Sequence, residues 1–170
     1  MAPELGGSAR AIDLIGVNHY HDAQWEFDGG ALAWRRDARR RDFSVLLTDA
    51  WRRYRLPLVV AETSHVGTQR APWLDEIAAE TIRAAEAGVP VQGLCLYPAV
   101  DRPDWNDLDH WHHSGLWDIV DAATMEATVE GDRIRPRVGH RSVPRHLYGA
   151  YAERIAEWQR RTAALGLHPA

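Results

Sequence analysis

The chain has 170 residues, of which 45% are hydrophobic and 26% charged, a composition typical of a globular domain rather than a disordered or collagen-like chain. Arginine and lysine together number 20 against 24 acidic residues, a net charge of −4, which argues against a nucleic-acid partner bound through its phosphates. No apolar run is long enough for a membrane span and no signal-peptide pattern opens the chain, so we expect no membrane partner and a cytoplasmic protein. We expect a single domain over residues 1–170.

Three short apolar segments rich in β-branched residues predict β-strands. They span residues 12–17, 58–61 and 91–96. Between them, apolar side chains recur at helical spacing, first from Phe43 to Tyr54 and then from Leu74 to Ala85. An alternation of strands and helices requires crossover connections, so the sequence predicts an α/β fold with parallel strands and outer helices.

The part of the chain after the third predicted strand is less regular. The stretch from Pro98 to Gly115 is polar and rich in tryptophan, which favours a functional loop over a linker. A weak hairpin is expected around Gly131, and a final helix is expected from about Pro144 to Leu165.

The single cysteine, Cys95, lies within the third predicted strand. One cysteine excludes an intramolecular disulfide and any metal site built from several thiolates. Because its neighbours are both leucine, we expect Cys95 to be a small buried hydrophobic residue.

Polar side chains follow each of the three predicted strands. They are Asn18, His19 and Tyr20 after the first strand, Glu62 after the second, and Tyr97 and Asp101 after the third. In parallel α/β sheets ligands bind outside the carboxyl ends of the strands, so we expect these side chains to share one rim.

Glu62 directly follows four apolar strand residues, so its carboxylate must either project into solvent or be held by donors. The amide of Asn18 and the phenol of Tyr20 could hold it ionised and oriented. Tyr97 and Trp105 offer flat apolar faces that suit a sugar ring. These neighbours favour a carbohydrate site over the alternative of an exposed glutamate at a strand end.

Three motifs resemble family 1 glycoside hydrolases and their clan relatives, in matching order. Residues 13–20, DLIGVNHY, resemble the sixth-strand motif, and residues 57–64, PLVVAETS, resemble the seventh-strand motif that carries the catalytic nucleophile. Residues 93–105, GLCLYPAVDRPDW, are similar to the eighth-strand motif with its sugar-binding loop, and residues 115–118, GLWD, resemble the segment that follows it. The resemblance implies a partial (β/α) barrel of about three parallel strands with a C-terminal helix. It also implies hydrolysis of β-glucosides or β-galactosides with retention.

The resemblance also implies roles for individual residues. Glu62 would be the nucleophile that forms a covalent glycosyl-enzyme, Tyr20 would donate a hydrogen bond to it, and Asn18 would line the same pocket. Tyr97 stands where the family usually has a tryptophan platform under the sugar. Trp25, in the loop beyond the first strand, could form part of the wall around the leaving group.

Two loop acids match the third motif less directly. Asp104 stands where the family usually has a glutamate that binds the outer hydroxyls of the sugar, with Trp105 beside it. Asp101 matches a loop acid that could be functional or structural.

Half of the expected active site is missing from the sequence. A complete eight-stranded barrel takes about 250 residues, and neither the Asn-Glu dipeptide that carries the family's general acid/base nor its early-strand arginine and histidine are found here. A retaining glycosidase needs two carboxyl groups about 5 to 5.5 Å apart. The second could come from Glu26, which we favour within the chain, from Asp104, from Asp101 or from another subunit.

Other interpretations stay open. The chain could be a non-catalytic remnant of a glycosidase barrel that binds a sugar or a partner protein. It could also be a metal-dependent hydrolase built on the histidine-rich run 107–113, but adjacent His112 and His113 would point apart, so we expect no metal and no cofactor. Three parallel strands leave two open edges, which predicts either a homo-oligomer that covers the inner face or closure by the C-terminal hairpin and helix.

Overall fold

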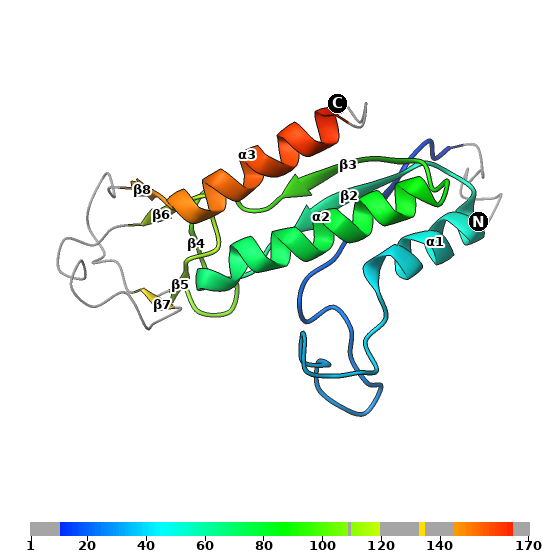
Figure 1. Ribbon diagram of the computed structural model, residues 1–170. Helices are drawn as coiled ribbons and strands as arrows, with labels where there is room; N and C mark the ends of the chain where they lie inside the picture. The colour runs from blue at the N-terminus through cyan, green and yellow to red at the C-terminus, as the bar shows by residue number, and fades with distance from the viewer. Residues whose placement is uncertain (1–10, 109, 120–132, 135–144, 165–170) are drawn as a thin grey trace.

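The computed structural model describes residues 11–108, 110–119, 133–134 and 145–164. Its centre is a parallel sheet in the order β1-β2-β3, and the helices α1, α2 and α3 lie along one side of it (Figure 1). The elements of this layer are β1 (Ile15–Asn18), α1 (Phe43–Tyr54), β2 (Leu58–Thr63), a short 3-10 turn at Gly67–Gln69, α2 (Arg70–Glu86), β3 (Val91–Leu96) and α3 (Gly149–Ala164). This arrangement confirms the predicted α/β class with three parallel strands and outer helices.

The strand boundaries follow from where a neighbouring strand is present. The first strand begins at Ile15, later than predicted, because the backbone pairing with the next strand starts there, with the Ile15 amide donating to Pro57 at 3.0 Å. The apolar side chains before it, Ile12 and Leu14, are exposed. β2 continues to Thr63, past the predicted end, and β3 has the predicted bounds.

The helices begin and end near the predicted signals. α1 starts at Phe43 and is terminated by Arg55 in the left-handed region, with φ 55°, before Pro57 is reached. α2 starts at Arg70, so that Pro72 lies in its first turn, where a missing amide hydrogen is tolerated. Gly88, with φ 89°, makes the turn into β3, a backbone conformation that favours glycine.

The core lies between the sheet and the first two helices. Leu58 and Val60 of β2 are fully buried and belong to one cluster with Leu47 of α1 and with Trp73 and Ile77 of α2. Burial of such side chains stabilises the fold by about 1.5 to 3 kcal/mol each. The sheet therefore has one face covered by helices and a second face that the described helices leave open.

The C-terminal helix packs on α2 rather than closing the sheet. Tyr151 and Trp158 of α3 belong to a second cluster with Leu74 and Ala78 of α2. The Trp158 indole also donates to Asp75 of α2 at 2.8 Å. None of the described helices is long and apolar enough to cross a membrane.

Short antiparallel strands lie in and beyond the functional loop predicted from Pro98 to Gly115, and only the first two of them are inside those bounds. They are β4 (Arg102–Pro103), β5 (Trp111–His112) and β7 (Arg133–Ile134) in one ladder, and β6 (Trp117–Ile119) and β8 (Arg145–Leu147) in another. The hairpin expected around Gly131 and the helix start expected at Pro144 lie outside the described residues.

The prediction that Cys95 is buried is wrong. Its neighbours Leu94 and Leu96 pack against the helical layer, whereas Cys95 is exposed. Successive side chains of a strand point to opposite faces, so Cys95 lies on the face that no described helix covers. An apolar run predicts a strand, but it does not indicate whether both faces of that strand are covered.

Candidate active site

The direction of Glu62 is set by an irregularity near the end of β2. Val60 and Thr63 are both fully buried on the helical side, where Thr63 accepts a hydrogen bond from the Trp73 indole at 2.8 Å. Residues three apart in a regular strand would point to opposite faces. The register of β2 against β3 shifts between Val60 and Thr63, which resolves this conflict and re-aims the side chains between them, Glu62 included.

The structure brings Tyr20 and Asn18 to Glu62. Asn18, the last residue of β1, is the parallel partner of Glu62, and a second register shift lies directly before it. The Tyr20 hydroxyl donates to Oε2 of Glu62 at 2.9 Å. Burial, the hydrogen bond to Glu62 and the neighbouring groups Glu62 and Tyr97 raise the pKa of Tyr20 above its ordinary value, so the phenol stays protonated and remains a donor.

Two aromatic side chains and an arginine lie beside this pair. The Tyr97 amide donates to Thr63 at 3.1 Å, which fixes the end of β3 next to the end of β2. The guanidinium carbon of Arg102 lies 5.8 Å from the centre of the Tyr97 ring and 5.2 Å from that of Trp105. Trp105 is 75% exposed, so its indole face is available to a ligand.

His19 belongs to the helical layer rather than to the rim. It is 5% exposed and stacks on Phe43 with 4.3 Å between ring centres, and on Trp73 at 5.8 Å. Burial and the nearby Arg40 charge lower the pKa of His19 to about 4. The expectation that His19 shares the rim with Glu62 is therefore wrong, because neighbouring residues on an extended segment point to opposite sides.

Trp25 and Glu26 lie on an exposed loop after β1. Trp25 pairs with Ala31 through an isolated bridge and is 64% exposed. Glu26 forms an exposed ion pair with Arg39. Because its carboxylate is engaged with an arginine, the second carboxyl group of the predicted site remains unassigned.

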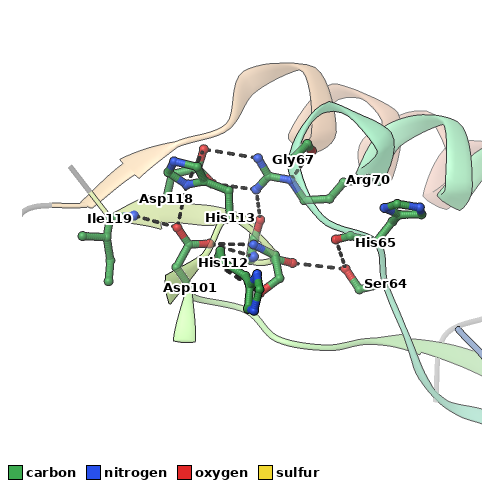
Figure 2. Close-up of polar contacts among 11 residues, drawn as sticks. Ser64, His65, Gly67, Arg70, Asp101, His112, His113, Asp118 and Ile119 are labelled. Carbon is green, nitrogen blue, oxygen red and sulfur yellow. Dashed lines mark hydrogen bonds and ion pairs between the residues drawn. The ribbon is translucent and has the colours of Figure 1, made fainter. Parts of the chain in front are cut away.

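Asp101 is the centre of a buried network that anchors the loop after β3 (Figure 2). Its carboxylate is 0% exposed and accepts backbone hydrogen bonds from Ser114, Gly115 and Ile119, each at 2.9 Å. Nδ1 of His113 lies 2.8 Å from the same carboxylate. With both oxygens satisfied inside the protein, the geometry favours the structural alternative for Asp101 over contact with a sugar.

Two cations balance the acids of this network. Arg70, 2% exposed, binds both oxygens of Asp118, at 2.6 and 3.2 Å (Figure 2). Burial alone would lower the pKa of His113, but its hydrogen bonds to Asp101 and Asp118 outweigh that effect and raise the pKa to about 9. His113 is therefore charged at neutral pH.

Asp101, His113 and Asp118 also offer three ligand atoms within 4.8 Å of one another, the spacing of a possible metal site. A metal needs neutral imidazole and unpaired carboxylates. Here Arg70 already binds both oxygens of Asp118, and Asp101 accepts three backbone hydrogen bonds. The cluster is better described as two carboxylates, Asp101 and Asp118, paired with two cations, Arg70 and His113.

Asp104 is held beside Trp105 by its own set of donors. Nε2 of His112 lies 2.8 Å from its carboxylate, and the Asn106 amide donates to it at 2.7 Å. The hydrogen bond from His112 is the main reason that the pKa of Asp104 falls to about 2. Adjacent His112 and His113 thus point to different acids, as expected, and Asp104 is ionised rather than able to donate a proton.

A cavity of about 440 Å³ lies elsewhere, against the helical layer. Its lining includes Trp34, Arg40, Phe43, Ile77 and Glu80. Neither Glu62 nor its tyrosine neighbours are part of this lining, so the cavity is separate from the Glu62 rim.

Sequence reasoning missed Arg102, and it considered His113 only as a metal ligand. Arg102 stands between two acids that the motif comparison singles out, and a basic residue in such a position was the available signal. The hydrogen bond between His113 and Asp101 joins residues 12 positions apart in an irregular loop. No periodic pattern in the sequence indicates such a contact.

Comparisons with known proteins find no matching family model and no matching curated protein. The fold does match solved structures. A β-glycosidase from the hyperthermophile Thermosphaera aggregans matches 94% of this chain at 15% identity and a TM-score of 0.56, over 33% of its own length. The β-glycosidase BGL167 matches 95% at 18% identity and a TM-score of 0.62, over 35% of its length. The family 1 β-glucosidase from Thermotoga maritima matches 85% at 14% identity and a TM-score of 0.53, over 34% of its length.

The chain thus spans about a third of the length of these solved structures. At such low identity the likeness concerns the fold. The protein has the fold of a partial (β/α) barrel, with three parallel strands and outer helices.

Proposed function

We propose that this chain carries the nucleophile of a retaining β-glycosidase that acts on β-glucosides or β-galactosides, and that Glu62 is that nucleophile. The observation that carries the proposal is the hydrogen bond from Tyr20 to Oε2 of Glu62 at the carboxyl ends of two neighbouring parallel strands. Ligand sites of parallel α/β folds lie at this end of the strands.

The geometry supports different roles for the two carboxylate oxygens of Glu62. Tyr20 occupies Oε2, so Oε1 is the oxygen that attacks the anomeric carbon of the sugar. The bond from that carbon to the leaving oxygen breaks, and the leaving oxygen takes a proton from a second carboxyl group. Water then hydrolyses the glycosyl-enzyme and returns Glu62 to its ionised form.

The neighbouring side chains fit the recognition of a sugar ring. Tyr97 and Trp105 provide flat faces for stacking, and Asn18 and the ionised Asp104 provide groups that bind hydroxyls. Trp25, exposed on the loop after β1, would contact the leaving group. This site needs no metal or other cofactor.

We further propose that the active unit is a homo-oligomer of this domain. β1 and β3 form the two edges of the described sheet, and exposed edges favour pairing with another chain. β8 pairs with β6 and α3 packs on α2, so these elements do not cover the edges. A second subunit would cover the inner face and could supply the second carboxyl group. Sedimentation of a well-folded monomer at micromolar concentration would contradict the oligomer.

Turnover of chromogenic β-glycosides by the Glu62→Ala variant tests the proposed activity. Loss of the covalent route should lower the rate at least about a thousandfold, whereas Glu86→Ala, an exposed glutamate at the end of α2, should leave the rate unchanged. Unaltered turnover by Glu62→Ala would reject the proposal. Sugar binding by the unmodified protein without any turnover would support the non-catalytic alternative.

A further inference from the structure

We propose that Arg102 binds an anionic group on the sugar, a carboxylate or a phosphate, beside Glu62. The inference deepens the proposed function, because it uses the same site and names the class of its ligand. It would make the preferred substrates acidic glycosides rather than neutral ones.

The first argument is that Arg102 has no carboxylate partner among the described residues, although acids flank it. Asp101 gives both oxygens to backbone amides and His113, and Asp104 is engaged by His112 and Asn106. Among the ion pairs of the described residues, none includes Arg102. The described residues of its loop therefore leave the positive charge uncompensated.

The second argument is an unused donor. Nε of Arg102 is buried and has no hydrogen-bond partner, while its Nη1 donates to the Pro103 carbonyl at 2.8 Å. A buried donor without a partner costs about 1 to 3 kcal/mol. Such a group in a folded protein calls for an explanation, and a ligand that accepts the hydrogen bond provides one.

The third argument is location. The guanidinium lies over the rings of both Tyr97 and Trp105, the two faces suited to stacking on a sugar. Its charge also acts on the Tyr20 phenol, against the stronger effects that raise the pKa of that group, which places it near the Tyr20–Glu62 pair. An anion bound here would lie on the same sugar that stacks on these rings.

Other arginines on aromatic rings show what is unusual about Arg102. Arg35 lies 4.3 Å from the Trp34 ring and pairs with Glu76. Arg70 lies 4.0 Å from the Tyr148 ring and pairs with Asp118. In both cases an acid from another element neutralises the arginine. Arg53, Arg55 and Arg161 also lie over aromatic rings without an ion pair among the described residues, but these three are exposed, whereas Arg102 is half-buried.

The chemistry of the guanidinium selects the ligand class. Its planar fork matches carboxylate and phosphate oxygens and binds them with two parallel hydrogen bonds. A glycosiduronate and a sugar 6-phosphate both carry an anion on the outermost carbon of the ring. Either would bring an anion to the charge that the described residues leave unpaired and accept hydrogen bonds from the guanidinium.

Calorimetric binding of three compounds to the full chain tests the proposal. The compounds are methyl β-D-glucoside, methyl β-D-glucuronide and glucose 6-phosphate, and the tighter of the two acids identifies the anion as carboxylate or phosphate. We expect at least one acid to bind at least tenfold more tightly than the neutral glucoside. Arg102→Gln should abolish that preference, and Arg102→Lys, which keeps the charge without the fork, should reduce it about threefold.

Arg53→Gln is the matched control, because Arg53 lies 5.8 Å from the Tyr54 ring on α1, away from Glu62. It should keep the full preference for the acid. Equal binding of acid and neutral sugar by the unmodified chain, no binding of any of them, or a preference that survives in Arg102→Gln would each overturn the proposal. If Arg102→Gln does not fold, the unmodified chain and Arg102→Lys still decide the matter.

The outcome is separable from that of the glycosidase proposal. A preference for acids with no turnover of any glycoside would reject the enzyme and keep the role of Arg102. Turnover of neutral glycosides without a preference for acids would support the enzyme and reject the role of Arg102.

Discussion

The Tyr20 hydroxyl holds Oε2 of Glu62 at 2.9 Å across the ends of β1 and β2, linking residues 42 positions apart in the sequence. This bond keeps the side chain in one orientation and, under the proposed function, leaves the other carboxylate oxygen to react. It depends on the register shift between Val17 and Asn18 that brings Asn18 opposite Glu62. The sheet therefore positions the Glu62 carboxylate, and the phenol orients it.

Removing this hydroxyl should impair the reaction without unfolding the protein. A hydrogen bond to a charged group is worth about 1.5 to 3 kcal/mol, so Tyr20→Phe should lower kcat/KM roughly 10- to 150-fold on a chromogenic β-glycoside. Tyr54→Phe, on the exposed end of α1, is the control and should have no effect. Equal rates for the two variants would contradict the orienting role of Tyr20.

The network around Asp101 should matter for stability. Asp101→Asn removes the buried charge that holds three backbone amides and His113, so we expect a loss of about 3 to 5 kcal/mol in the free energy of unfolding by urea. Asp49→Asn breaks an exposed ion pair with Arg41 and should cost less than about 1 kcal/mol. Similar losses in the two variants would show that the network is not a stabilising anchor.

The charge on His113 predicts a loss of stability at alkaline pH. Its pKa in the folded protein, about 9, lies above the ordinary value of 6.5, so its contribution is complete below pH 6.5 and disappears as the pH rises to 9. We expect a decrease on the order of 3 kcal/mol over this window in thermal unfolding. His113→Asn should lose this slope, and a wild-type slope in that variant would contradict the assignment.

His19 predicts the opposite trend on the acidic side. Its pKa of about 4 lies below 6.5, so the neutral ring stabilises the fold above pH 6.5 and this contribution is lost as the pH falls towards 4. The change should be on the order of 3 kcal/mol. His19→Phe keeps the ring stacking on Phe43 and should flatten the acidic limb only, just as His113→Asn should flatten the alkaline limb only. A change in both limbs from either variant would contradict separate titrations.

The elements with a strong hydrophobic period were predictable from the sequence. α1 follows the spacing from Phe43, and β3 has the predicted bounds. Both were predictable because the spacing of their apolar residues indicates which side chains are buried against the sheet or the helices. Ile12 and Leu14 misled the prediction, since an apolar residue forms part of a strand only where a partner strand is present.

The site was predictable only in part, because tertiary contacts determine the rest. Glu62 and Tyr20 follow two predicted strands, and parallel pairing brings them together. The burial of His19, the enclosure of Asp101 and the unpaired charge of Arg102 depend on which neighbours an irregular loop meets in space. Local sequence does not predict those contacts. Asp101 was therefore a candidate for sugar binding, and Arg102 was not.

The most direct test of the central claim is mass spectrometry of peptides after treatment with a 2-fluoro-β-glycoside bearing a good leaving group. Such a reagent forms the glycosyl-enzyme rapidly, and this glycosyl-enzyme then hydrolyses slowly. The label therefore stays on the nucleophile of a retaining enzyme. We expect a single glycosyl adduct on Glu62, absent in Glu62→Ala. An adduct on another carboxylate, or no adduct while β-glycosides are turned over, would contradict the account.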